Sequence, residues 1–343
     1  MRSFSFILVL FFCVGCEKVF FKDDPPNTSE SNFELFWKDF DRYYAQFGIR
    51  GIDWDAVYVA VKPSTVNITD QQLFSILSGE VVKLNDMHVS LYTPYGYSGW
   101  KGWGHGKYPS GRIVNPCKYF PCSSVTKTSV FEYTGFKDNN FGYIAITTFS
   151  GTGSISSRGY DDRYDEIDKI IALFRNLDGI VVDVRWNGGG NSQNAETIAS
   201  RFADEKRLAS RHRSKNGPAK NDFSDWSDWF IEPKGPYQFT KPVVVLTSRL
   251  TSSSAEDFVM YMRELPNVTI VGDTTGGGTG NPIFRELPNG WNFRLSTAYA
   301  ETADHQLVDG KGIIPDVVVQ TSAADSISGL DRILEKGIEI LKK

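Results

Sequence analysis

Residues 243–265, VVVLTSRLTSSSAEDFVMYMREL, join an apolar strand-like run to a helix-like run through three consecutive serines. Ser253 and Glu256 form the S-x-x-E pattern of a capping box, in which the serine hydroxyl accepts a hydrogen bond from an N–H group of the first helical turn. A serine at a sharp strand-to-helix turn also presents its hydroxyl beside free backbone N–H groups, as a nucleophile and its oxyanion site require. The stretch therefore predicts a buried strand, a tight turn and a helix, and it makes Ser253 a candidate nucleophile.

Apolar strand-like runs alternate with amphipathic helix-like runs through residues 141–320. The clearest are FGYIAITTF, DDRYDEIDKIIALFRNL, GIVVDVR, NAETIASRFA, KPVVVLTS and VTIVGDTT. Strands that are apolar on both faces, each followed by a helix, predict an α/β core with a mostly parallel sheet. FRELPNGWNFRLSTAYA adds a hairpin around Asn289 and Gly290, and residues 321–343 have the period of a C-terminal helix.

The part of the chain before this core has a different character. Residues 32–91 carry aromatic side chains at helical spacing and the N-cap-like start ITDQQLFSILSGEVVKL, which predict an N-terminal helical subdomain. Residues 92–140 are rich in Gly, Tyr, Trp and Pro without a clear period, so we expect an irregular or β insertion there.

Charge and composition exclude several classes of partner. The 343 residues carry 37 basic and 41 acidic side chains, a net charge of -4, with the two signs interspersed. No basic stripe is present, so nucleic acid is not an expected partner. The four cysteines and four histidines lack the spacing of a zinc site, and we expect neither a metal nor another cofactor.

The first residues have the order of an export signal. Arg2 is followed by an apolar run over residues 4–12 that is too short to span a bilayer, and then by a small-residue boundary. Val14, Gly15 and Cys16 resemble the end of a bacterial lipobox, whose cysteine is lipid-modified after cleavage. We expect a signal peptide over residues 1–15, lipidation of Cys16, a polar tether over residues 16–31, and anchorage in the bacterial cell envelope.

Two cysteines remain for the exported part of the chain. Cys117 and Cys122 flank KYFP, and in an oxidising compartment they could form a local disulfide or remain as two free thiols.

A second chemically suggestive stretch is WNGGGN, residues 186–191, directly after GIVVDVR. Glycines let the backbone turn sharply, and the following helix start offers free N–H groups to an anion. A tight strand-to-helix turn is the simpler interpretation. Dinucleotide binding is disfavoured because the triplet lacks the G-x-G-x-x-G spacing. An oxyanion needs only one or two N–H donors, so this loop suits acyl transfer.

A serine nucleophile needs a base, and histidine best matches neutral pH. His88 follows a helical segment, His105 lies in a Gly/Trp-rich loop, and His212 and His305 lie in polar contexts. Sequence spacing alone does not choose among these four.

Several motifs together resemble the family of C-terminal-processing and tricorn-type serine peptidases. They occur in family order over residues 33–319 and read DWDAVY, LNDMHVSL, FGYIAI, IVVDVRWNGGG, LTSRLTSSSAEDF, VGDTTGGGTG and DGKGIIPDVVV. The resemblance implies a crotonase-like fold and places the nucleophile at Ser253. One family branch uses a lysine at the position of Gly278, so the resemblance favours the Ser-His branch. In that branch the base falls on His88, after Met87, where a small residue is usual.

The resemblance also implies the other parts of the site. Asp309 corresponds to the acid that orients the histidine, with Glu256 as the alternative. N–H groups of Gly189 and Ser254 would hold the oxyanion, and Gly190 is a possible accessory. Family members often carry a peptide-binding PDZ domain, for which residues 92–140 are too short, so none is predicted.

Three functions follow from these residues. The first is a serine peptidase acting on peptides or unfolded protein tails in the cell envelope. The second is a non-catalytic peptide- or lipophile-binding module on the same fold. The third, a crotonase-type thioester enzyme, shares the oxyanion logic but is opposed by export.

Overall fold

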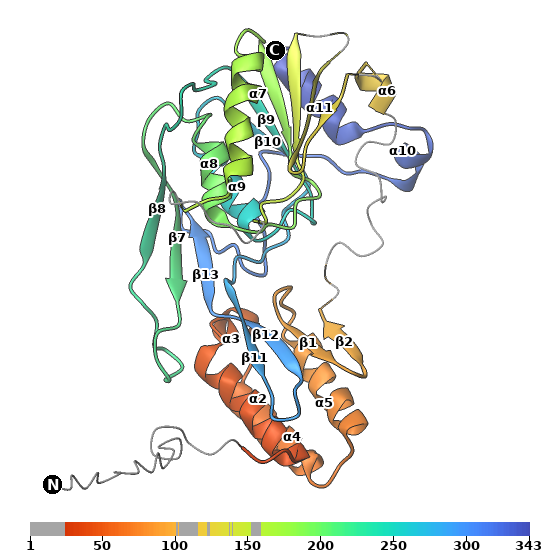
Figure 1. The fold of residues 1–343 in the computed structure, drawn as a ribbon, viewed down its shortest axis with the longest axis vertical. Coiled ribbons are helices and arrows are strands. Elements are labelled where there is room, and N and C mark those ends of the chain that lie inside the picture. Colours follow the sequence, from red (N-terminus) through yellow and green to blue (C-terminus); the bar gives the residue numbers. More distant parts are fainter. Residues whose placement is uncertain are drawn as a thin grey trace, which may run out of the picture.

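The computed structural model describes residues 25–100, 102, 116–121, 124–136, 138, 140–151 and 159–343. The expected signal peptide, Cys16 and the tether up to residue 24 lie outside the described residues. The first helix, α2 (Ser29–Tyr43), begins three residues before the expected end of the tether, because the Thr28 side chain accepts from the N–H of Ser31 and caps it. Figure 1 shows two lobes, one above the other.

The upper lobe is built on a seven-stranded sheet. Its strands, in spatial order, are β14 (Val317–Val318), β10 (Val268–Gly272), β9 (Val243–Thr247), β6 (Gly179–Asp183), β5 (Phe141–Ile146), β4 (Phe131–Gly135) and β3 (Thr126–Lys127). The first five run parallel to one another, and β4 and β3 add an antiparallel edge. The predicted mixed α/β fold with a mostly parallel sheet is confirmed.

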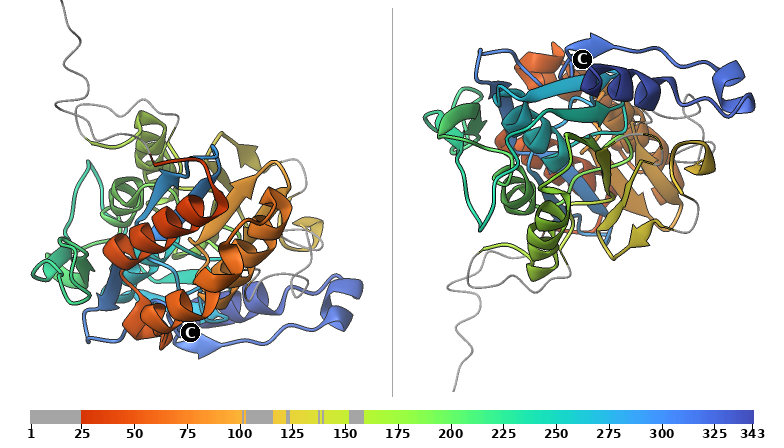
Figure 2. Two further views of the ribbon diagram at one scale, coloured as in Figure 1. Left: turned by 90° about the horizontal axis from the view of Figure 1, so that it is seen from below. Right: turned by 90° about the horizontal axis from the view of Figure 1, so that it is seen from above.

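Both faces of this sheet are covered, which explains the continuous apolar runs of its strands. Ile180 and Val182 of β6 point into a core shared with α7 (Glu166–Phe174), α8 (Ser192–Ala199) and α9 (Ser254–Arg263). Val181 points to the opposite face, against α11 (Arg332–Leu341). Seen from above, α11 lies along the sheet in dark blue (Figure 2). The short η2 (Asp162–Asp165) leads into α7.

The C-terminal segment differs from the single helix that we expected over residues 321–343. It forms α10 (Ala323–Ile327) and α11, separated by Gly329, whose φ of 67° is left-handed. Asp331 then caps α11 by accepting from the N–H of Leu334 at 3.0 Å. Arg185 also donates to Asp331 and to Asp183, so this pair of ionic contacts ties β6 to α11.

The lower lobe combines N-terminal helices with a four-stranded sheet. The helices are α2, α3 (Phe47–Arg50), α4 (Trp54–Val61), η1 (Lys62–Thr65) and α5 (Asp70–Lys83). The strands, in spatial order, are β11 (Pro282–Glu286), β12 (Asn292–Ser296), β1 (Ser90–Thr93) and β2 (Gly96–Gly99). Phe36 and Phe40 of α2 lie 5.2 and 5.6 Å, ring to ring, from Phe293 of β12. The aromatic stripe of the first helix therefore packs on strands from a distant part of the sequence, drawn in blue beside red helices in Figure 1.

The irregular or β insertion expected over residues 92–140 contains strands, and they divide between the two lobes. β1 and β2 belong to the lower sheet, where β1 pairs with β12, while β3 and β4 belong to the upper sheet. Strand pairing between distant segments has no local sequence signal, so the sequence did not predict that these strands belong to two different sheets. The hairpin predicted around Asn289 and Gly290 is confirmed, since β11 and β12 flank it.

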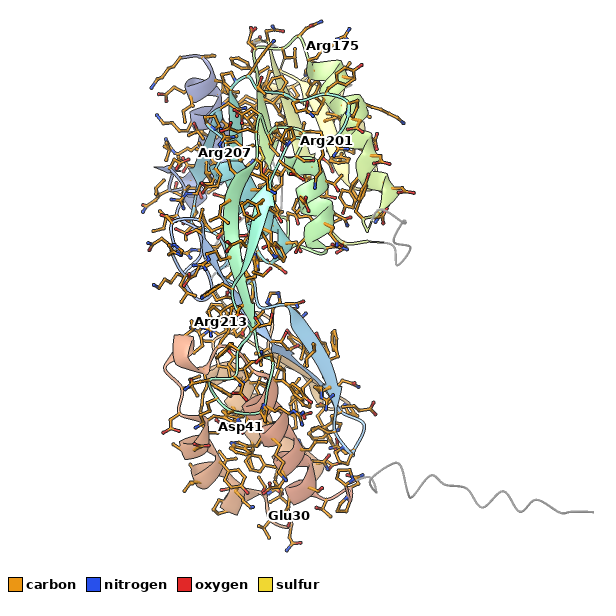
Figure 3. All side chains as sticks on the ribbon, turned by 90° about the vertical axis from the view of Figure 1, so that its left-hand side faces the viewer. Glu30, Asp41, Arg175, Arg201, Arg207 and Arg213 are labelled. Atoms are coloured by element: carbon orange, nitrogen blue, oxygen red, sulfur yellow. The ribbon has the colours of Figure 1, made fainter. Side chains whose placement is uncertain are left out.

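A three-stranded sheet connects the lobes. It consists of β13 (Ala298–Thr302), β7 (Arg207–Ser214) and β8 (Ser227–Ile231). Arg213 of β7 lies at the level where the lobes meet, with Arg201 and Arg207 above it and Asp41 below (Figure 3). Lys220, in the loop between β7 and β8, contacts Asp55 of α4. β13 follows β12 almost directly, so one stretch of chain runs from the lower sheet into this connecting sheet.

Two further features bear on the expected export of the chain: a disulfide at Cys117 and the character of the helices. Cys117, in α6 (Pro116–Tyr119), forms a disulfide, while its expected partner Cys122 lies outside the described residues. None of the helices in the described ranges has the length and apolar character needed to cross a bilayer.

Candidate active site

Ser253 occupies a strained turn between β9 and α9. Its φ and ψ are 57° and -132°, a combination that a residue with a Cβ rarely adopts. Its N–H donates to the carbonyl of Gly278 at 3.0 Å and to Glu256 at 3.2 Å. The capping box predicted from the sequence is present. Backbone strain of this kind costs on the order of 1–3 kcal/mol and is usually kept where function requires it.

Glu256 is buried beneath this turn and binds four donors. Its oxygens accept from the hydroxyl of Thr275, from the N–H groups of Gly277 and Gly278, both at 2.8 Å, and from Ser253. Burial disfavours the charged carboxylate and raises the pKa of Glu256 to about 7, although the hydrogen bonds from Thr275, Gly278 and Gly277 act in the opposite direction. Glu256 therefore holds the loop 275–278 against the serine turn and does not face a histidine.

The glycine loop lies directly against the serine. A Cβ added to Gly189, whose φ is 95°, would stand 2.6 Å from the Cβ of Ser253 and 2.8 Å from the nitrogen of Ser254. No larger residue fits such an approach. The loop and the serine turn thus form one compact unit at the carboxyl ends of β6 and β9.

The N–H of Gly189, which the resemblance makes an oxyanion donor, is already hydrogen-bonded. It donates to the side-chain oxygen of Asn187 at 2.9 Å, so in this conformation it is not free for a ligand. Within the described residues, the N–H groups of Ser254 and Gly190 have no hydrogen-bond partner. The side chain of Asn187, two residues earlier, thus binds the N–H that the family resemblance assigned to the oxyanion.

His88 comes from the lower lobe, between α5 and β1. Its backbone N–H donates to Asp86 at 2.8 Å, and its carbonyl accepts from the Nε of Arg294 at 2.7 Å. Asp86 is buried and also accepts from the hydroxyls of Tyr44 and Ser296. The main chain of His88 is therefore held on both sides.

The imidazole of His88 is buried and uncharged at neutral pH. Burial lowers its pKa to about 4; nearby Asp86 opposes this shift, whereas Arg294 and Arg50 add to it. Its Nδ1 is buried and has no hydrogen-bond partner among the described residues. A buried polar atom without a partner costs roughly 1–3 kcal/mol.

Ser253 and His88 line the same cavity, of about 550 Å³, where the two lobes meet. Its other lining residues are Met87, Thr148, Ser150, Gly188, Gly189, Gly190, Ser252, Pro282 and Arg294. The fold thus brings together a hydroxyl from the upper lobe, an imidazole from the lower lobe and the glycine loop. Such a cavity can hold a polypeptide segment beside a nucleophile and a base.

Asp309 does not orient His88 in this structure. One of its oxygens accepts from Gln46 at 2.8 Å and from the N–H of Thr279 at 2.9 Å, and the other accepts from the Thr279 hydroxyl and from the N–H of Ala300 at 3.0 Å. Burial raises the pKa of Asp309 to about 6. The expectation that Asp309 or Glu256 binds the imidazole is corrected here, because other donors occupy both carboxylates.

The sequence profile of peptidase family S41 matches residues 140–319, more than half of the chain. The chain belongs to peptidase family S41. The resemblance stated from the motifs is confirmed. The matched range of this peptidase-family protein contains Ser253 and Asp309, whereas His88 comes from a segment that the profile does not cover.

Individual relatives agree with this assignment. The chain is 31% identical over 185 residues to the carboxy-terminal processing protease CtpA of Bacillus subtilis (strain 168), a match that covers 54% of this chain and 36% of that protein. The chain thus spans about a third of the length of the curated relatives that it matches first.

Solved structures extend the likeness to almost the whole chain. A Parabacteroides merdae ATCC 43184 protein, provisionally assigned as a peptidase, is 31% identical and superposes with a TM-score of 0.82 over 93% of this chain and 98% of that one. Mature CPAF, at 14% identity, gives a TM-score of 0.67 over 92% of this chain and 97% of that one, which shows the same fold.

In this family S41 member, Met87 fills the space in front of Gly278. A Cβ at Gly278 would lie 2.5 Å from the Cγ and the Sδ of Met87 and 3.7 Å from Cε1 of His88. A lysine at this position would therefore collide with the segment that carries the histidine. The structure thus gives a steric reason for the glycine.

The sequence reasoning missed three residues that hold the site. Asp86 stands in the quoted motif LNDMH, but its contact with the His88 main chain has no sequence signal. Arg294 and Gln46 lie far from any motif and reach the site only through pairing of β12 and packing of the segment after α2.

The remaining histidines lie elsewhere. His212 stacks on Trp229 with ring centroids 3.7 Å apart, and His305 lies within 3.2 Å of Arg211 on the exposed surface, while His105 is outside the described residues. Over the described residues, no three His, Cys, Asp or Glu side chains gather as metal ligands would.

Proposed function

We propose that this chain is a serine peptidase in which Ser253 is the nucleophile and His88 the general base. The observation that supports this most directly is that a strained serine and a buried, neutral imidazole from separate lobes line one cavity. The strain at Ser253 presents a hydroxyl to the cavity, and the lowered pKa keeps the imidazole of His88 unprotonated at neutral pH, so a ring nitrogen is open to the serine proton.

The reaction follows from these positions. Ser253 Oγ bonds to the carbonyl carbon of the scissile peptide while its proton passes to Nε2 of His88, which then protonates the leaving amine. Water, deprotonated by the same imidazole, then releases the acyl group from Ser253. The free N–H of Ser254, with a second donor from the glycine loop, stabilises the oxyanion. Each such donor contributes about 3 kcal/mol to transition-state stabilisation.

In this proposal Gly190 replaces Gly189 as the loop donor, because the Gly189 N–H is bound to Asn187. Asp309 accepts hydrogen bonds from Thr279 and Ala300 and reaches the base only indirectly. Asp86 and Arg294 hold the base by its main chain.

We infer the substrate class and the fold family from the relatives. Several are named carboxy-terminal processing proteases, so we propose peptides or protein tails as substrates. The parallel sheet with helices on both faces supports a crotonase-like core with an N-terminal lobe that supplies the histidine.

We also propose export and anchorage in the cell envelope through lipid-modified Cys16, on the basis of residues 1–16. Incorporation of radiolabelled palmitate into the full chain tests this, with Cys16→Ser as the control. The label is expected to disappear in the variant, and a label that persists would contradict the proposal.

A fluorophosphonate probe tests the catalytic assignment. Wild-type protein should form a covalent adduct on Ser253, Ser253→Ala should form none, and His88→Ala should react at least ~100-fold more slowly because a general base contributes on the order of 10²–10⁴. Ser252→Ala serves as a matched control, since Ser252 lines the same cavity and should keep the label. Labelling at another serine would overturn the assignment.

One observation favours the second candidate, a non-catalytic binding module: Nδ1 of His88 has no partner among the residues that the structure describes, so none of their carboxylates orients the ring. A binding module would bind peptide but would not react with the probe.

A further inference from the structure

Of the described residues that line the active-site cavity, Arg294 is the one with a permanent charge. Its Nε and Nη2 donate to the carbonyls of His88 and Met87, at 2.7 and 3.2 Å. Carbonyl oxygens satisfy hydrogen bonds but do not neutralise the charge. Among the described residues, neither a carboxylate nor any acceptor for Nη1 of Arg294 is within bonding distance. Within the described part of the chain, the cavity therefore carries beside its base a positive charge that no direct ion pair neutralises.

Arg294 lies on the face of the lower sheet that the helices do not cover. It stands opposite Phe284 of β11 and Ser90 of β1, and side chains directly opposite in a sheet share a face. Tyr92 and Tyr97, paired two residues further along, lie on this face too. The other face is buried against the helices.

Three aromatic side chains are exposed on this uncovered face. Phe284 is 63% exposed, Tyr97 59% and Tyr92 40%. The ring of Tyr92 lies 5.1 Å from that of Tyr97 and 6.4 Å from that of Phe284. We call these three residues the aromatic face. A contiguous exposed apolar patch on a soluble protein commonly marks a site of interaction.

The aromatic face is continuous with the active-site cavity. Pro282 and Arg294 line the cavity, and Phe284 is two residues along the same strand from Pro282 and paired with Arg294. The Tyr97 hydroxyl lies 2.5 Å from where a Cβ of Gly99 would be, so its ring leans along β2 toward Ser90 and Arg294. A polypeptide leaving the cavity on this side would pass over these rings.

We propose that the aromatic face and Arg294 together form the docking site for the polypeptide substrate. Apolar side chains of the substrate pack on Tyr92, Tyr97 and Phe284, and a carboxylate of the same polypeptide binds Arg294. The charge fits because no described carboxylate is in direct contact with Arg294, and guanidinium groups bind carboxylates preferentially. This inference rests on the proposed function and specifies the substrate: an apolar segment with a carboxylate close to the scissile bond.

Binding to the Ser253→Ala variant tests docking without requiring turnover. Fluorescence anisotropy is measured with a leucine-rich decapeptide in four forms: free C-terminus, amidated C-terminus, amidated with one internal glutamate, and amidated with glutamine in its place. A C-terminal carboxylate site predicts about tenfold tighter binding of the first form than of the second, and a side-chain site predicts the same for the third over the fourth.

Arg294→Gln, added to Ser253→Ala, should abolish that preference, and Arg294→Lys should retain part of it. Because Arg294 also holds His88, only the ratio between charged and uncharged peptides is informative, and it does not depend on the position of the base. Equal binding of all four peptides, or a preference that survives Arg294→Gln, would overturn the role of Arg294.

Phe284→Ser tests the aromatic face. It should weaken binding of every peptide about fivefold to tenfold, because one ring's worth of apolar contact is lost. Leu173→Ser is the matched control: Leu173 of α7 is 64% exposed and lies in the upper lobe, so it should leave binding unchanged. Equal effects of the two substitutions would refute the docking surface.

The fluorophosphonate reaction separates this inference from the proposed function. Leu173→Ser in a chain with Ser253 intact should react with the probe as the wild type does, because Leu173 lies outside both the cavity and the aromatic face. Loss of peptide binding with an unreactive wild-type serine would keep the docking site and reject the peptidase. A reactive serine together with unaltered peptide binding in Phe284→Ser and Arg294→Gln would keep the peptidase and reject the docking site.

Discussion

Asp86 accepts the backbone N–H of His88 at 2.8 Å, and Arg294 donates to the carbonyl of the same residue at 2.7 Å. The histidine is thus positioned through its main chain, while its buried Nδ1 lacks a partner in the described structure. In a triad the carboxylate holds the ring itself. Here the nearest acid holds the backbone, and its effect on the imidazole is electrostatic.

Substitution of Asp86 should separate these two effects. Asp86→Asn keeps an oxygen for the His88 N–H but removes a negative charge that raises the pKa of His88. We expect the acid limb of kcat/KM to move to lower pH with a modest loss of kcat. Asp86→Ala, which also removes the backbone contact, should reduce kcat at least ~10-fold. An unchanged acid limb in Asp86→Asn would contradict the electrostatic role.

The pH dependence of the wild-type enzyme should reflect the buried imidazole. An ordinary histidine has a pKa near 6.5, whereas burial lowers that of His88 to about 4. His88 stays neutral above that value, so its protonation should limit kcat/KM only near pH 4. Circular dichroism at each pH verifies that the fold persists. Glu256→Gln is the control, because a limb near pH 7 caused by Glu256 would vanish in that variant and one caused by His88 would not.

The strain at Ser253 predicts opposite effects on stability and activity. Glycine adopts a φ of 57° without cost, so Ser253→Gly should raise the free energy of unfolding by about 1–3 kcal/mol while abolishing hydrolysis. Ser253→Ala should abolish hydrolysis as well but keep the strain. Urea denaturation of the two variants gives the comparison. If glycine is no more stable than alanine, the turn is not strained in solution.

Glu256 should make stability depend on pH. Its folded pKa, about 7, exceeds its ordinary value of 4.5, so the native state binds the proton more tightly than the unfolded chain. The resulting stabilisation is fully present below about pH 4.5 and is lost as the pH rises through about 7. At about 1.4 kcal/mol per pKa unit, the wild type should lose roughly 3 kcal/mol relative to Glu256→Gln across this window.

Asp309, with a pKa raised to about 6, contributes with the same sign, and His88, with a lowered pKa, contributes with the opposite sign. The wild-type curve therefore mixes several groups. The difference between the wild type and Glu256→Gln isolates one of them, and a difference that does not vary with pH would show that Glu256 is ionised throughout.

The contact between Met87 and Gly278 can be tested by rescue. Gly278→Ala places a Cβ 2.5 Å from Met87 and should push the segment that carries His88, reducing kcat by about tenfold or more. Met87→Ala in the same chain opens the space and should restore most of the loss. A Gly278→Ala variant that remains impaired beside Met87→Ala would indicate that the glycine is needed for its own backbone.

Local features of the fold could be predicted from the sequence. The strand, turn and helix around Ser253, the capping box with Glu256 and the hairpin at Asn289 and Gly290 all depend on residues a few positions apart. Their signals are periodicity and turn chemistry, which the chain carries locally. The membership of β1 and β2 in the lower sheet was missed because their partner strand β12 lies far along the chain.

The residues of the candidate site likewise divide into those that local sequence indicated and those that depend on distant contacts. Family resemblance, not spacing, selected His88 among four histidines, and the structure then placed it in one cavity with Ser253. The assignment of the third group did not hold, because Gln46, Thr279 and Ala300 occupy Asp309. Likewise, Asn187 takes the N–H of Gly189. Whether a given donor reaches a given acceptor depends on differences of about an ångström in loop geometry. The types of the neighbouring residues in the sequence do not reveal such differences.

The sequence by itself determined the alternation of buried strands with helices and the sharp turn that displays a serine, since apolar period and backbone preference act over neighbouring residues. Only the tertiary structure decided which imidazole shares a cavity with that serine, which carboxylates are already bound, and that Arg294 borders the cavity with no salt-bridge partner among the described residues. These depend on the packing of two lobes whose parts are interleaved along the chain, so no short segment contains them.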